Sequence, residues 1–162
     1  MKIQEFFRLG MDRELPTLLD FPEGVVLNVG AGNKHIPGAV SLDLPDWDAN
    51  VQPLPYVSDS VAGIHAYNFL EHVERPIDVL AEFQRVLKVD GVLNVVVPHY
   101  RCQGAYHDIT HQSWWSEDTW KTLFWNRYFK TSRYEWRWRL HANFIIGLNE
   151  NNLALCTQLV KT

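Results

Sequence analysis

The chain has 162 residues, a formal net charge of −4 and two cysteines. This length suits a single domain spanning residues 1–162, and the negative charge argues against nucleic acid or an anionic membrane as a partner. Two cysteines are too few for a disulfide framework. The N-terminal segment lacks the long apolar core of a signal peptide or a membrane span, so we expect a cytoplasmic protein with no membrane contact.

The first two thirds of the chain predict a short helix and four strands. Residues 3–20 predict an amphipathic helical segment, interrupted near Gly10 and Pro16. The run "GVVLNV" at 24–29 is rich in β-branched residues, which is typical of a strand buried on both faces. Three further apolar runs predict strands at 38–44, 61–67 and 91–98.

Two helices and a hairpin are predicted between and after these strands. Residues 75–91 carry an apolar stripe at helical spacing, with Pro76 at a position that suits the first turn and Asp90-Gly91 at the expected end. A second helix is predicted over 116–124 with Ser116 as its cap. The apolar segments 134–148 and 153–160 flank "NENN", which indicates a hairpin.

Buried strands that alternate with a helix indicate a mainly parallel sheet with helices on its faces. We therefore expect an α/β fold of the Rossmann-like, doubly wound type, with three αβα layers. The C-terminal hairpin would add antiparallel strands at one edge of the sheet.

A glycine turn and a carboxylate follow the first two predicted strands. Gly30 and Gly32 end the first strand, and Asp43 ends the second strand only thirteen positions after Gly30. In an open α/β sheet, ligands bind beyond the carboxyl ends of the strands, and a carboxylate there accepts hydrogen bonds from a ribose diol. The dinucleotide fingerprint would need glycine at position 35, where His35 stands, and "GNKH" is no Walker A loop. The pattern indicates a nucleoside site, although a plain strand turn would use glycine in the same way.

The longer stretch from "LNVGAGNKHIPGAVSLDL" to "GVLNVVVPHY" resembles the class I S-adenosylmethionine-dependent methyltransferases, in particular the small-molecule methyltransferases with a shortened first helix. The resemblance covers roughly residues 25–120 and depends most on "LPY", "DS", "LEH" and "EFQRVLKVDG" in that order. It implies S-adenosylmethionine as the cofactor.

The resemblance also implies which residues contact that cofactor. Gly30, Ala31 and Gly32 would line its methionine part, Asp43 would bind the ribose with Leu44 beside it, and Asn50 and Val51 would border the adenine. Asn68 and Phe69 would border the methyl group, and Glu71 and His72 form a pair that begins the next element. Asn28 and Asn50 stand where many members have acidic residues, so we expect weaker cofactor binding.

The segment after the fourth strand, "PHYRCQGAYHDITHQSWW", carries candidate catalytic residues. His107 or His111 could act as a base or an orienting group together with Asp108, since histidine titrates near neutral pH. Asp108 and Thr110 could instead form a structural turn. A metal site using His107 and His111, with Asp108 or His99, would require a helix here. We assign the histidines and Asp108 to catalysis, and we assign no metal ligand.

We expect a methyltransferase that acts on an O or N atom of a small-molecule acceptor, and leave open whether it acts alone, as a homo-oligomer or with a partner chain. A methyltransferase for nucleic acid or protein is one alternative, and a binding module without turnover is another. Trp114, Trp115 and Trp120 could line a substrate pocket, although such aromatic residues more often fill a core.

Overall fold

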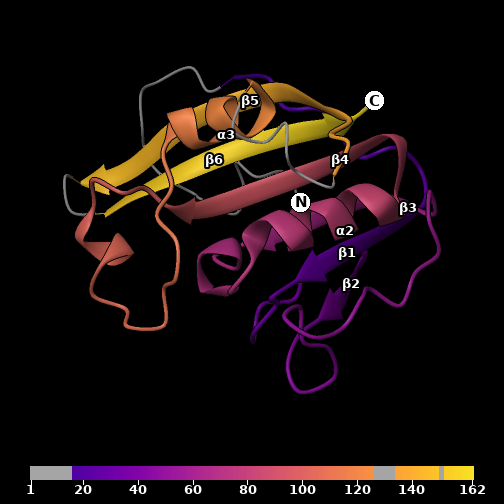
Figure 1. Cartoon of the computed structure of the whole chain (residues 1–162), viewed down its shortest axis with the longest axis horizontal. Coiled ribbons are helices and arrows are strands. Elements are labelled where there is room, and N and C mark those ends of the chain that lie inside the picture. The colour runs from indigo at the N-terminus through magenta and orange to yellow at the C-terminus, as the bar shows by residue number, and fades with distance from the viewer. Residues whose placement is uncertain (1–15, 126–133, 150–151) are drawn as a thin grey trace.

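Within the described residues of the computed structural model, which are 16–125, 134–149 and 152–162, six strands form one mixed sheet (Figure 1). The strand order is β2-β1-β3-β4-β6-β5. The strands are β1 (Val25–Val29), β2 (Ala39–Leu42), β3 (Val61–Tyr67), β4 (Leu87–Pro98), β5 (Trp138–Asn149) and β6 (Asn152–Lys161).

The first four strands are parallel, whereas β6 runs antiparallel to β4 and β5 runs antiparallel to β6. The α/β class, the mainly parallel sheet and the antiparallel hairpin at one edge are therefore confirmed. Because β1 to β4 are parallel, their carboxyl ends meet at the same edge of the sheet. The loops that follow these four strands therefore lie close together.

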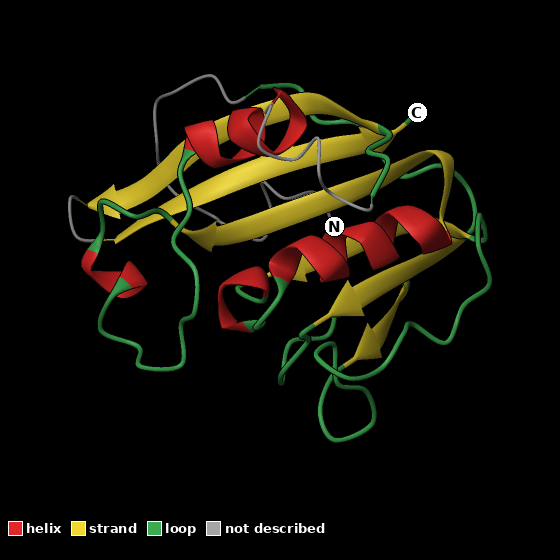
Figure 2. Cartoon of the chain, viewed as in Figure 1, coloured by secondary structure: helices red, strands yellow, loops and turns green. Residues whose placement is uncertain are grey.

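The two α-helices of the described residues, α2 (Pro76–Val86) and α3 (Glu117–Trp125), cover the same face of the sheet (Figure 2). Phe83 of α2 and Trp120 of α3 pack in one core cluster with Leu93 of β4. The opposite face is covered in part by residues 18–21, where the Phe21 ring lies 4.6 Å from the His65 ring. The second helical layer that we expected is not found in the described part of the chain, and no helix there has the length and apolar character needed to cross a membrane.

Two local expectations differ from the structure. The helix ends at Val86 rather than at Asp90-Gly91, because β4 begins at Leu87. Asp90 instead has φ of 62° at an irregularity in the β3–β4 pairing. Residues 16–20 are not helical, and the rest of the expected first helix, up to residue 15, lies outside the described residues.

Candidate functional site

The glycine turn after β1 is fixed to the neighbouring strand and to a ring above it. The Gly30 N–H donates a hydrogen bond of 2.9 Å to the Leu42 carbonyl of β2. Gly30 has φ of 63°, and a Cβ there would lie 2.4 Å from Cδ2 of Phe69. Both the conformation and the contact therefore require glycine at position 30.

Asp43 directs its carboxylate over this turn. Its Oδ2 accepts a hydrogen bond from the Gly32 N–H at 2.5 Å, and its Oδ1 accepts one from the Leu44 N–H at 2.8 Å. A carboxylate offers about four acceptor sites, so each oxygen can still accept a bond from a ligand hydroxyl. A Cβ added to Gly32 would meet no atom within 4 Å, so the backbone there is open to a ligand. The turn and the acid therefore place free carboxylate acceptor sites beside open backbone, which are the groups that we expected to contact a ribose.

Asn28 of β1 stabilises the glycine turn through a hydrogen bond to its backbone. Its side chain is buried, and Nδ2 donates a hydrogen bond of 2.8 Å to the Lys34 carbonyl. The Lys34 N–H in turn donates to the Ala31 carbonyl at 2.8 Å. An aspartate at position 28 would have no donor for this carbonyl, which gives the asparagine a structural reason.

Asn50 likewise supports the backbone. Its Oδ1 accepts a hydrogen bond from the Glu74 N–H at 2.9 Å, and its own N–H donates to Asp48. Asn50 and the exposed Val51 line a shallow cavity of about 200 Å³ together with Trp47. Asn50 and Val51 are the residues that we expected to border an adenine, and both line this cavity.

Asn68 and Phe69 follow β3 directly. Asn68 is exposed, has φ of 50°, and its N–H donates to the Val96 carbonyl of β4 at 2.7 Å. The Phe69 ring lies 6.0 Å from Trp47 and covers Gly30, as described above. These residues therefore lie between the glycine turn and the loop that follows β4.

The candidate catalytic residues lie in a non-helical turn. Asp108 accepts hydrogen bonds from the Thr110 N–H at 2.9 Å and from the Thr110 hydroxyl at 2.7 Å, and these bonds lower the pKa of Asp108. His111 Nδ1 bonds to the Ala105 carbonyl at 3.1 Å, and its Nε2 lies 3.8 Å from Asp108 Oδ2. His107 is exposed and lies outside this network. The helix needed for a metal site built on His107 and His111 is not present.

A second set of polar residues joins this turn to the segment after β3. The His72 ring lies 4.6 Å from the His111 ring, and His72 Nδ1 bonds to Thr110 Oγ1 at 2.8 Å. Glu71 is 1% exposed, and its burial raises the pKa of the carboxyl to about 8. The sequence identified Glu71 and His72 as a pair, but it gave no sign that His111, thirty-nine positions after His72, lies against them.

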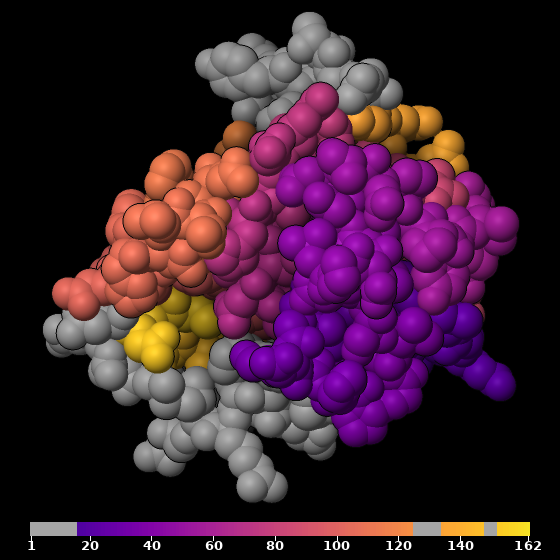
Figure 3. All heavy atoms as spheres, turned by 90° about the horizontal axis from the view of Figure 1, so that it is seen from below, coloured from indigo at the N-terminus to yellow at the C-terminus, as the bar shows by residue number. Residues whose placement is uncertain are grey.

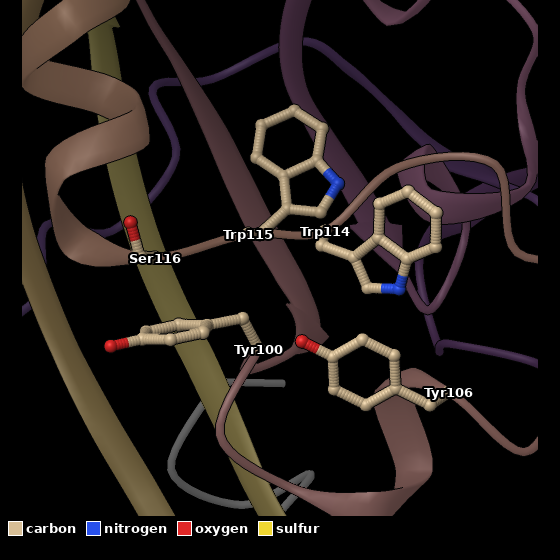
Figure 4. Close-up of a pocket in the computed structure, with 5 residues that line it drawn as sticks. All are labelled: Tyr100, Tyr106, Trp114, Trp115 and Ser116. Atoms are coloured by element: carbon tan, nitrogen blue, oxygen red, sulfur yellow. The ribbon is translucent and has the colours of Figure 1, made fainter.

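Aromatic side chains form a cavity of about 420 Å³ just after β4 (Figure 4). Trp115 is buried, whereas Tyr100, Tyr106 and Trp114 expose about half of their surface or more. Trp120 is fully buried, so it belongs to the core rather than to a pocket. The residues that line the cavity are Tyr100, Tyr106, Trp114, Trp115 and Ser116.

These parts lie along one face of the molecule. In the view from below, the orange segment after β4 lies beside the magenta segment after β3, and the indigo and violet segments around β1 and β2 follow (Figure 3). The contacts agree with this order, since the Gln112 N–H donates to the Glu71 carbonyl at 2.7 Å and Phe69 covers Gly30. The glycine turn with Asp43 and the aromatic cavity are thus linked through the segment after β3.

Residues 27–95 match the family model described as a methyltransferase domain. This segment is therefore similar to methyltransferase domains, and the match covers less than half of the chain. The match contains the glycine turn, Asp43 and the segment after β3, and the family implies S-adenosylmethionine as the cofactor. No curated protein matches the chain.

Solved structures share the fold at low sequence identity. The complex between the Haloferax volcanii Trm112 methyltransferase activator and a methyltransferase gives a TM-score of 0.62 at 16% identity, covering 87% of this chain and 84% of that one. An S-adenosylmethionine-dependent methyltransferase from Listeria monocytogenes gives 0.58 at 12%, covering 90% and 94%. The [4+2]-cyclase SpnF gives 0.61 at 12%, covering 85% and 74%. The same fold therefore supports more than one reaction.

Proposed function

We propose that this methyltransferase transfers the methyl group of S-adenosylmethionine to an O or N atom of a small-molecule acceptor. The observation that carries the proposal is the Asp43 carboxylate, which lies over the open glycine turn with acceptor capacity to spare. When bound, S-adenosylmethionine supplies an electrophilic methyl group together with its own leaving group. The protein then has to bind the cofactor and the acceptor, align them and exclude water.

The residues proposed to hold the cofactor lie along the carboxyl edge of β1 to β3. Asp43 accepts hydrogen bonds from the two ribose hydroxyls, and the open backbone at Gly32 contacts the methionine part. Asn68 and Phe69 border the methyl group. The other proposed contacts are made by Gly30, Ala31, Leu44, Asn50, Val51 and His72.

The acceptor is proposed to enter through the aromatic cavity after β4. This cavity is large enough for a small molecule and lies beyond the segment that would border the methyl group. His107, Asp108 and His111 are polar residues of the adjoining loop, and we propose that they position the acceptor atom. The acidic net charge gives no support to a nucleic-acid acceptor.

Binding can be tested by thermal unfolding with S-adenosylmethionine, S-adenosylhomocysteine, NAD and ATP. A ligand at one hundred times its dissociation constant adds about 2.7 kcal/mol to the free energy of unfolding, which raises the midpoint by several degrees. Stabilisation by NAD or ATP alone would contradict the proposal.

The ribose contact can be tested with Asp43→Asn. This change removes charge-assisted hydrogen bonds, so we expect the affinity for S-adenosylhomocysteine in calorimetry to fall roughly 10- to 100-fold. The matched control is Asp46→Asn, an exposed aspartate on the same loop, which should bind as the parent does. Equal affinity of both variants would exclude Asp43 from the site.

Turnover can be measured as transfer of a labelled methyl group to a panel of small phenols and amines, with RNA and protein as comparison acceptors. A binding module without turnover is the second candidate, because the amides of Asn28 and Asn50 hold the protein's own backbone. Binding of S-adenosylhomocysteine without transfer to any of these acceptors would favour that candidate.

A further inference from the structure

We propose that Glu71, His72 and His111 form a binding site for a divalent transition-metal ion such as Zn²⁺. The ligand atoms of these three residues all lie within 4.8 Å of one another. Two ligands of a tetrahedral zinc ion are separated by about 3.4 Å, given metal–ligand distances of about 2.1 Å. Side-chain movements of about an ångström would therefore close the site.

The hydrogen bonds around His72 and His111 leave one nitrogen of each ring ready to bind a metal. The Thr110 hydroxyl donates its single hydrogen to Asp108, so it must accept the bond from His72 Nδ1–H. The Ala105 carbonyl can only accept, so His111 Nδ1 also carries a hydrogen. In the neutral form of each ring, Nε2 therefore has a free lone pair, and the Nδ1 bonds orient the rings as is usual for metal-binding histidines.

Glu71 is an independent indication of a cation. It is 1% exposed, and neither carboxylate oxygen has a hydrogen-bond partner among the residues that the structure describes. The charged form of a buried carboxyl group without a partner is strongly unfavourable, and a bound cation would stabilise that form. Two histidines and one glutamate also form a ligand set found in catalytic zinc sites, where a fourth position stays open.

The backbone around the cluster is well fixed. The Gln112 N–H donates to the Glu71 carbonyl at 2.7 Å, and Gln112 Nε2 donates to the His72 carbonyl at 3.1 Å. These bonds join the turn after β3 to the loop after β4, which brings ligands from distant parts of the sequence together. Asp108, whose Oδ2 lies 3.8 Å from His111 Nε2, adds a negative charge beside the site.

This site differs from our expectation of no metal ligand, and it uses a different residue set from the one that a helix over 107–111 would have formed. Metal binding does not depend on the proposed methyl transfer. If that function holds, an open fourth position near the aromatic cavity could bind the acceptor oxygen or nitrogen, and this role rests on the proposed function.

The test is titration of the chelator-treated protein with ZnCl₂ by calorimetry and with CoCl₂ by visible absorption. We expect one ion per chain and the intense absorption of four-coordinate Co²⁺. Glu71→Gln and His111→Gln should each lower the Zn²⁺ affinity at least tenfold, and Thr110→Val should lower it 10- to 100-fold through the ring orientation. His107→Gln is the matched control for metal affinity, because His107 is exposed and outside the cluster.

Failure of the parent protein to bind one ion, or equal affinities of Glu71→Gln and the parent, would overturn the site. Circular dichroism would show whether each variant is folded. If Glu71→Gln does not fold, His72→Gln would replace it, because His72 is less buried than Glu71. S-adenosylhomocysteine binding by the metal-free protein, measured in parallel, separates failure of the metal site from failure of the proposed function.

Discussion

Acid should destabilise the protein through His65. This residue lies in β3, is 2% exposed, and its burial lowers the pKa from 6.5 to about 4. The unfolded chain therefore binds a proton at a higher pH than the folded one. The stability from the neutral ring is fully present above pH 6.5 and is lost as the pH falls from 6.5 towards 4. A shift of this size corresponds to roughly 3 kcal/mol.

The measurement is the free energy of unfolding in urea at a series of pH values between roughly 7 and 4. Other groups titrate in this range, so the informative quantity is the difference between the parent and His65→Gln. His65→Gln should be less stable than the parent at neutral pH, because His65 Nδ1 bonds to the Tyr67 hydroxyl at 2.7 Å. Its free energy of unfolding should also change less with pH than that of the parent. His35→Gln, at an exposed position, should keep the parental slope. Identical slopes for the parent and His65→Gln would refute the argument.

Three further outcomes can be checked by thermal melting together with calorimetry. Gly30→Ala should lower the free energy of unfolding by more than about 1 kcal/mol, because Gly30 has a positive φ and lies against the Phe69 ring. Gly32→Ala should lower it by about 1 kcal/mol, because Gly32 has a positive φ but open space around it. The Gly32→Ala variant should also bind S-adenosylhomocysteine more weakly. The reverse order of stability would contradict this reasoning. Asn28→Asp should cost about 1–3 kcal/mol, because the buried side chain would no longer donate to the Lys34 carbonyl, and an unchanged melting point would be inconsistent with that bond. Trp120→Ala should cost about 3–5 kcal/mol, and Trp114→Ala, at an exposed ring, should cost much less; similar losses would show that both rings belong to the core.

The sequence predicted the sheet well because its signals are local. The β-branched run before Gly30 became β1, and the apolar stripe of residues 79–87 is buried as expected. The end of the helix was placed too late, since an Asp-Gly pair at 90–91 is as compatible with a strand irregularity as with a helix end.

The candidate site was predictable only where its residues follow the ends of neighbouring strands. Asp43 and the glycine turn follow adjacent parallel strands, so the strand order brings them together. Glu71 and His111 meet through two loops whose paths depend on tertiary hydrogen bonds such as that from Gln112. No periodicity in the sequence encodes such a contact.

The position of β6 has a consequence for synthesis of the protein. This strand comes last among the described elements, yet it lies inside the sheet between β4 and β5. During translation β5 emerges first, and it has no strand to pair with until residues 152–161 have left the ribosome. We therefore expect the nascent chain to expose the edges of β4 and β5 that later pair with β6, which makes it a natural client for chaperones that shield such edges.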